Sequence, residues 1–141
     1  MGRIMAIDLG RRRCGIAVTD SMRIVATPLA TVETSRLNQF LTEYLSRESV
    51  DIIVAGKPVD MSGNPSDCTR YIEPALQRLR KVLPSGVKIE RYDERFTSSL
   101  AHRAMIDSGM TRTQRRDKEA VDRMAATIML NDYLSSKQYQ G

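Results

Sequence analysis

The sequence predicts an α/β fold with a mixed five-stranded sheet, in which a three-strand antiparallel meander precedes parallel strands and helices flank both faces. Three short apolar segments with tight links open the chain, which is typical of a meander. Helical apolar stripes then alternate with short apolar runs, which is typical of β-α-β crossovers. No repeat or linker interrupts the pattern, so we expect a single domain over residues 1–141.

The first three expected strands cover residues 3–8, 14–19 and 23–32. A turn at 10–13 joins the first two, and Pro28 breaks the third. Because the links are only a few residues long, neighbouring strands should run antiparallel.

The middle of the chain alternates between helix and strand. Apolar residues from Leu37 to Leu45 repeat at helical spacing, and Ser35 is the expected N-cap of this helix. The apolar run at 51–56 predicts a buried parallel strand. After a loop, a second helical stripe extends from 68 to 83, and Pro74 inside it should kink or restart the helix.

The last third continues the same alternation. Residues 87–92 predict another strand, and Thr97 is the expected cap of a helix that ends near residue 109. A basic loop at 109–117 leads to a final helix that reaches about Leu134. The complete expected order is therefore β-β-β-α-β-α-β-α-α.

Composition excludes several classes of protein. With 41% hydrophobic and 28% charged residues, the chain has the composition of a soluble globule. No apolar run approaches the roughly 20 residues that span a bilayer, and no signal peptide is evident, so we expect a cytoplasmic protein. A single histidine and two distant cysteines, Cys14 and Cys68, disfavour zinc and predict free buried thiols.

The charge distribution favours a polyanionic partner. The net charge is +5, and arginines cluster at 11–13 and again at Arg112, Arg115 and Arg116. Aromatic residues make up only 5% of the chain and Trp is absent, which disfavours a stacking platform for single-stranded bases. Ordinary solvated surface is the alternative interpretation of both clusters.

Carboxylates follow strand ends in a pattern that predicts a metal site. Asp8 ends the first strand, Asp93 and Glu94 follow the strand at 87–92, and Asp122 lies early in the last helix. Carboxyl ends of parallel strands meet at one sheet edge, so these acids could converge. Carboxylates suit Mg²⁺ or Mn²⁺, which activate water for phosphodiester cleavage. Strand alternation sends Asp93 and Glu94 to opposite sides; we favour Glu94, with Asp93 as the alternative.

Structural roles remain open for each acid. Asp8 could end a strand and cap a turn, Asp122 could complement a helix N-terminus, and Asp20 is interpreted as a turn residue rather than a ligand.

Four segments in order resemble the YqgF family of Holliday-junction-resolvase relatives. The segments read AIDLG at 6–10 with GIAVTD at 15–20, VAGKPVDMSG at 54–63, YDERFTS at 92–98, and VDRMAA at 121–126. The resemblance implies an RNase H-like fold, nuclease processing of the pre-16S rRNA 5′ end, and a catalytic, metal-binding site on Asp8, Glu94 and Asp122. It also implies three core acids where dedicated junction resolvases use four. The arginines after Asp8 and the lysine at position 57 depart from the family pattern.

We expect a set of basic and polar residues near this site to contact nucleic acid: Arg11, Arg12, Arg13, Lys57, Asn64, Arg95, Arg112, Arg115 and Arg116. The expected partners are structured RNA, above all pre-rRNA in ribosomal particles, or else branched DNA. The sequence leaves open RNA against DNA, one metal ion against two, endonuclease against exonuclease, and monomer against homodimer.

Three functions compete at this point. The first is a metal-dependent nuclease, with a Holliday-junction resolvase as its DNA-cutting form. The second is an actin-like-fold ATP-binding protein, because Asp8-Leu9-Gly10 resembles a phosphate loop; that superfamily builds its cleft from two such domains, and 141 residues supply one. The third is a non-catalytic RNA-binding assembly factor, which has no reason to cluster acids.

Overall fold

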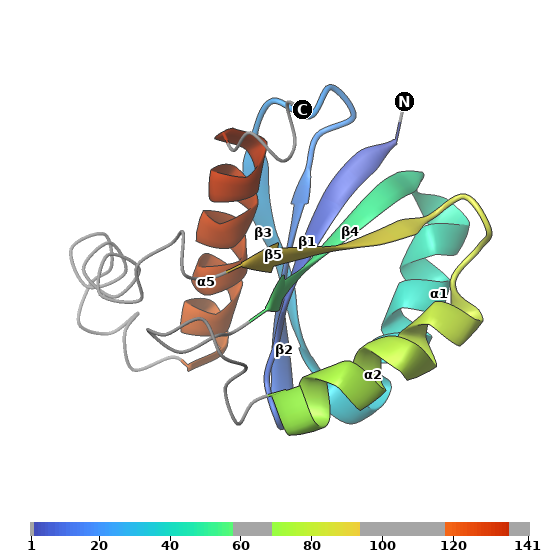
Figure 1. The fold of residues 1–141 in the computed structure, drawn as a ribbon. Helices are drawn as coiled ribbons and strands as arrows, with labels where there is room; N and C mark the ends of the chain where they lie inside the picture. The colour runs from blue at the N-terminus through green and yellow to red at the C-terminus, as the bar shows by residue number, and fades with distance from the viewer. Residues whose placement is uncertain (1, 58–68, 94–117, 136–141) are drawn as a thin grey trace.

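A five-stranded sheet lies between helices in the computed structural model, which describes residues 2–57, 69–93 and 118–135 (Figure 1). The strands are β1 (Arg3–Leu9), β2 (Arg13–Thr19), β3 (Ala26–Glu33), β4 (Val50–Lys57) and β5 (Lys88–Asp93). Their order across the sheet is β3-β2-β1-β4-β5. The β1–β2 and β2–β3 pairs are antiparallel, whereas β1–β4 and β4–β5 are parallel. The predicted mixed sheet is therefore confirmed.

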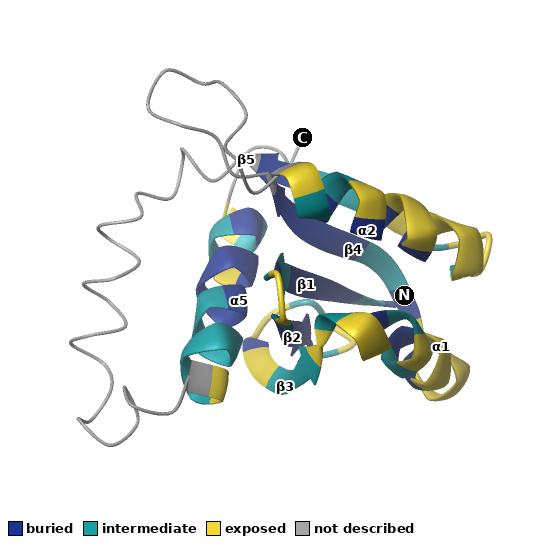
Figure 2. Cartoon of the chain, turned by 90° about the horizontal axis from the view of Figure 1, so that it is seen from below, coloured by how far each residue is buried: buried dark blue, intermediate teal, exposed yellow. Residues whose placement is uncertain are grey.

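Helices cover both faces of this sheet, as predicted. The 3₁₀ turn η1 (Thr34–Arg36) leads into α1 (Leu37–Arg47), and α2 (Thr69–Val82) packs beside α1. Figures 1 and 2 show α1 and α2 on one face of the sheet and α5 (Lys118–Ser135) on the other. The outward surfaces of α1 and α2 are exposed, while the strands between the layers are buried (Figure 2).

Strand alternation assigns each side chain of β1 to one of two cores. Met5, Ile7 and Leu9 belong to the core under α1 and α2. Ile4 and Ala6 belong to the core under α5, together with Tyr133. Asp8 has the same parity as Ile4 and Ala6, so it lies on the α5 face, where that core ends.

The third strand begins later than predicted, at Ala26 rather than residue 23. The carboxylate of Asp20 accepts hydrogen bonds from the backbone N–H groups of Met22, Ile24 and Val25 at 3.3, 2.8 and 2.9 Å. These bonds hold the segment in a turn, and sheet pairing starts only after it. Asp20 is therefore a turn residue, as interpreted from the sequence.

The structure contradicts the predicted cap of α1 and one of the two alternatives predicted for α2. Ser35 lies inside η1, and α1 starts after Arg36 without a side-chain cap. The 3₁₀ turn η1 continues directly into α1, so the first residues of α1 follow an existing helical turn rather than a capping side chain. Helix α2 is continuous from Thr69 to Val82 with Pro74 inside it, which excludes a restart of the helix at Pro74.

Several predictions fall on residues outside the described ranges: the helix expected from Thr97 to residue 109, the loop at 109–117, and Cys68. Cys14 is buried and free, as expected. Among the described residues, no helix has the length and apolarity that crossing a membrane requires.

Candidate nuclease site

The β1–β2 hairpin carries three arginines to one end of the sheet. The Gly10 N–H donates to the Arg13 carbonyl at 3.0 Å and closes the turn. A Cβ on Gly10 would lie 2.3 Å from that carbonyl oxygen, so only glycine fits. The Thr34 hydroxyl donates to the Gly10 carbonyl at 2.8 Å, and the Thr34 N–H donates to the Arg12 carbonyl at 2.8 Å. The arginine-bearing tip is thus fixed to the end of β3.

Asp8 is a half-buried carboxylate on the central strand. Its cross-strand partner on β2 is Gly15, whose missing side chain lets the backbone of α5 approach the sheet beside Asp8. No donor among the described residues forms a hydrogen bond with its carboxylate. Burial away from water, and then repulsion by the charge of Asp122, raises the pKa of Asp8 from 3.8 to about 6. A divalent cation would relieve both effects.

Asp122 is brought to Asp8 by the close approach of α5 to β2. A Cβ on Gly15 would lie only 1.9 Å from the Asp122 carbonyl oxygen, so the helix backbone lies directly over this glycine. The Asp122 side chain accepts a hydrogen bond from Arg13 Nε at 2.7 Å, which is also an ion pair. Two of the three predicted acids therefore meet, with Arg13 between them and the hairpin tip.

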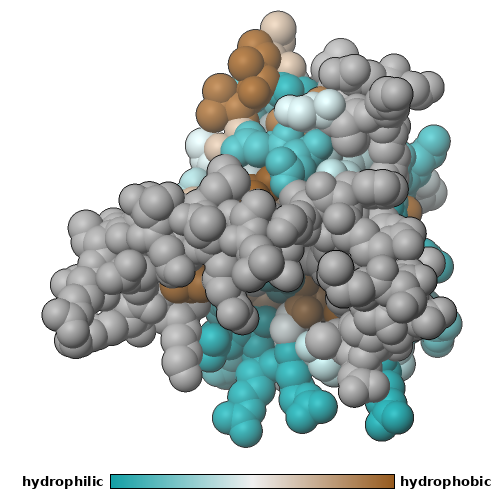
Figure 3. Space-filling view, turned by 60° about the vertical axis from the view of Figure 1, so that its left-hand side comes forward, coloured by the Kyte–Doolittle hydropathy of each residue, from teal (hydrophilic) through white to brown (hydrophobic). Residues whose placement is uncertain are grey.

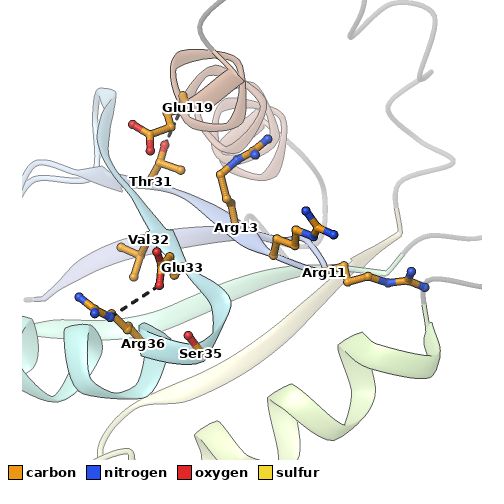
Figure 4. A pocket seen from close by; sticks show the side chains of 9 residues that line it. Arg11, Arg13, Thr31, Val32, Glu33, Ser35, Arg36 and Glu119 are labelled. Carbon is orange, nitrogen blue, oxygen red and sulfur yellow. Dashed lines mark hydrogen bonds and ion pairs between the residues drawn. The ribbon is translucent and has the colours of Figure 1, made fainter.

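An open hollow of about 740 Å³ is connected to this pair of acids through Arg13, and Figure 4 shows the side chains that line it. It extends from the hairpin over the end of β3 to η1. Its lining residues are Arg11, Arg12, Arg13, Thr31, Val32, Glu33, Ser35, Arg36 and Glu119. Four guanidinium groups against two carboxylates give the lining of the hollow an excess of positive charge. Such a lining suits an anion, and arginine pairs well with phosphate.

The four arginines differ in their contacts. Arg36 forms an exposed ion pair with Glu33 at 3.6 Å, and the Arg11 guanidinium lies 5.6 Å from the centre of the Tyr71 ring. Arg13 is bound to Asp122. Arg12 is exposed, and no carboxylate among the described residues pairs with it. Arg12 is therefore the cation most available to a phosphate.

The third predicted acid, Glu94, lies outside the described residues, as do Asn64, Arg95, Arg112, Arg115 and Arg116. Lys57 is the last residue of β4, and in the parallel backbone register it lies opposite Asp93, the last residue of β5. The two strands therefore end at the same end of the sheet. Across the described ranges, no three His, Cys, Asp or Glu side chains form a complete metal-binding group.

Sequence reasoning missed three features of this site. The register of the tight hairpin could have identified Gly15 as the residue opposite Asp8. The ion pair of Arg13 with Asp122 joins residues far apart in the chain and has no local signal. Arg36 reaches the hollow only because η1 turns the chain back beside the hairpin.

A known protein family and proteins of known sequence resemble this chain over nearly its whole length. The RuvX family, described as "Holliday junction resolvase", matches residues 2–136. A protein of Bacteroides fragilis is 46% identical over 138 residues, which cover 98% of this chain and 99% of that protein. A protein of Parabacteroides distasonis is 45% identical over 140 residues, covering 99% of each. Both are named "Putative pre-16S rRNA nuclease".

A solved structure shares the fold. The T. thermophilus RuvC, in complex with a Holliday junction substrate, matches with a TM-score of 0.59 at 14% identity, covering 99% of this chain and 98% of that one. This likeness shows the RuvC-like RNase H fold. Since the family match spans almost all of the sequence, and relatives near 45% identity cover it from end to end, this chain belongs to the RuvX/YqgF family.

Proposed function

We propose that this chain is a metal-dependent nuclease that hydrolyses phosphodiester bonds at the 5′ end of pre-16S rRNA. One observation carries the proposal: Asp8, a carboxylate without a described hydrogen-bond donor, lies near Asp122, and Asp122 is paired with Arg13 of the arginine-lined hollow. The names of the relatives support the substrate. The same proposal places the protein in the cytoplasm, with pre-rRNA or ribosomal particles as its partners.

The donor set fits Mg²⁺ or Mn²⁺. Both described acids offer oxygen ligands, which hard cations prefer. Burial and then the charge of Asp122 raise the pKa of Asp8, and a bound cation would offset both effects. We include Glu94 as the third ligand because the YDERFTS segment at 92–98 resembles the family motif that carries this acid. When bound, such an ion activates water and neutralises charge on the phosphoryl group.

The residues of the chain divide the remaining work. Arg11, Arg12 and Arg36 bind backbone phosphates in the hollow, which orients the strand across the end of β1. Asp8 and Asp122 would hold the cation through their carboxylate oxygens. Gly15 and the β1–β2 register fix the spacing between the two acids before substrate arrives.

RNA cleavage tests this function directly. Purified protein with Mn²⁺ should cut an RNA that carries the precursor 5′ extension, and excess EDTA should stop the reaction. Asp8→Asn, Asp122→Asn and Glu94→Gln should each abolish cutting while circular dichroism shows a folded protein. Cleavage that persists in all three variants would refute the site, and full activity in EDTA would refute the metal mechanism.

Branched DNA is the second candidate substrate, because the family description names a Holliday junction resolvase. A four-way DNA junction in the same assay separates the two. Preferential cutting of the RNA supports the proposal, whereas preferential cutting of the junction replaces its substrate.

A further inference from the structure

We infer that Arg13 is a positioning residue that couples the phosphate-binding hollow to the two acids. In the protein without substrate it holds Asp122, and a backbone phosphate that enters the hollow draws Arg13 away and frees Asp122 for the cation. The inference rests on the proposed nuclease function and names how substrate and metal act on each other at that site.

Arg13 belongs to both parts of the site at once. Its Nε donates to Asp122 Oδ2 at 2.7 Å, and the same side chain lines the hollow with Arg11 and Arg12 (Figure 4). Among the described residues, no acceptor is hydrogen-bonded to its two terminal nitrogens. Since a guanidinium carries five donors, these nitrogens can receive a phosphate before the bond to Asp122 breaks.

The ion pair between Arg13 and Asp122 is exposed enough to open when substrate arrives. The Arg13 and Asp122 side chains are 37% and 26% exposed, so water and substrate reach both. Partly exposed ion pairs are weak, so a phosphate or a divalent cation can displace either partner. A cation at Asp122 competes with the Arg13 guanidinium, because both are positive charges that bind the same carboxylate.

Linkage makes this competition measurable. If phosphate binding frees Asp122, RNA raises the affinity for the cation, and the cation raises the affinity for RNA by the same factor. Arg12 provides a matched control, because it lines the same hollow and carries the same charge without contacting Asp122. Arg12→Gln therefore reports the general effect of losing one positive charge, and Arg13→Gln adds the loss of the ion pair.

The experiment is a Mn²⁺ titration followed by electron paramagnetic resonance, with and without a phosphorothioate RNA that resists cleavage. Without RNA, Arg13→Gln should bind Mn²⁺ about fivefold more tightly than Arg12→Gln. The gain in Mn²⁺ affinity on adding RNA should be about fivefold smaller in Arg13→Gln than in Arg12→Gln. Equal affinities and equal gains in the two variants would overturn the inference.

Further variants separate this inference from the proposed function. Asp8→Asn should lose the Mn²⁺ site; if wild type and Asp8→Asn bind Mn²⁺ alike, the proposed metal site fails, and the inference fails with it. If Asp8→Asn loses the site but Arg12→Gln and Arg13→Gln agree, only the inference fails. Should Arg13→Gln not fold, Arg13→Lys replaces it: its ammonium lacks the planar fork, so Mn²⁺ affinity above that of wild type is expected, and affinity equal to wild type would contradict the role.

Discussion

Two aspartates at opposite ends of the β1–β2 pair have opposite environments. Asp20 accepts backbone hydrogen bonds from Val25, Ile24 and Met22, and these bonds lower its pKa. Asp8 has no such donors among the described residues, and burial together with the charge of Asp122 raises its pKa to about 6. Ionised Asp20 therefore stabilises the folded protein, whereas ionised Asp8 destabilises it.

The two ends of the molecule differ in the same sense. The Asp20 end presents exposed apolar side chains, Met22, Ile24 and Val25, and the Asp8 end presents arginines. Figure 3 shows a hydrophobic group at the top, where β2 turns into β3, and hydrophilic side chains at the bottom, near the β1–β2 hairpin. A carboxylate that the fold does not need, beside cations that favour phosphate, indicates a binding role.

The largest expected effect comes from the close packing that builds the Asp8 end. Gly15→Ala would place a methyl group on the Asp122 carbonyl, and because that atom is backbone, α5 must move. We expect a loss of about 3 kcal/mol in the free energy of unfolding, measured by urea denaturation, and loss of RNA cleavage. Gly86→Ala is the control, because nothing lies within 4 Å of its Cβ. Equal stability of the two variants would show that α5 does not depend on Gly15.

The pH dependence of stability separates the two aspartates next. In metal-free protein, Asp8 binds its proton more tightly when folded, so its ionisation destabilises the fold as pH rises from about 4 to about 6. Asp8→Asn should therefore raise the free energy of unfolding at pH 7 by about 2 to 3 kcal/mol, and the gain should vanish at pH 3.5.

Asp20→Asn should behave in the opposite way. Its carboxylate has a lowered pKa when folded, so it stabilises the protein above its ordinary pKa, and this contribution disappears as pH falls. The variant should be less stable than wild type at pH 7 and approach it in acid, while RNA cleavage below its unfolding temperature stays normal. If both substitutions destabilise at pH 7, the contrast between the two ends is wrong.

A smaller effect is expected where the hairpin is fixed to β3. Thr34→Val keeps the shape of the side chain but removes its hydrogen bond to the Gly10 carbonyl. The free energy of unfolding should fall by about 1 kcal/mol, and RNA affinity should fall with it because the arginine tip loses its anchor. Unchanged thermal unfolding and unchanged RNA binding would show that the Thr34 hydroxyl does not hold the tip.

The smallest effect concerns a single phosphate contact. Arg12→Gln should reduce the slope of log affinity for RNA against log salt concentration by about 1. Arg47→Gln is the control, because it removes the same charge from the exposed end of α1. A slope that falls equally in both variants would show that net charge, rather than the hollow, determines binding.

Sequence periodicity predicted the sheet and the location of Asp8, because alternation and apolar runs are local patterns. It also identified Asp20 as a turn residue. It could not predict that Asp20 would delay β3 to Ala26, since this depends on several side-chain to backbone bonds. The sequence could not predict the ion pair of Arg13 with Asp122, because these residues are 109 positions apart in the chain. Only the packing of α5 on β2 brings them together.

A crystal grown with Mn²⁺ tests the proposed site most directly. Anomalous scattering should locate the ion between the carboxylates of Asp8 and Asp122, with Glu94 as the proposed third ligand. No ion should occupy Asp20, whose oxygens are already bound by the turn. An ion at Asp20, or none at Asp8 under saturating Mn²⁺, would contradict the assignment of Asp8 as the metal-binding acid.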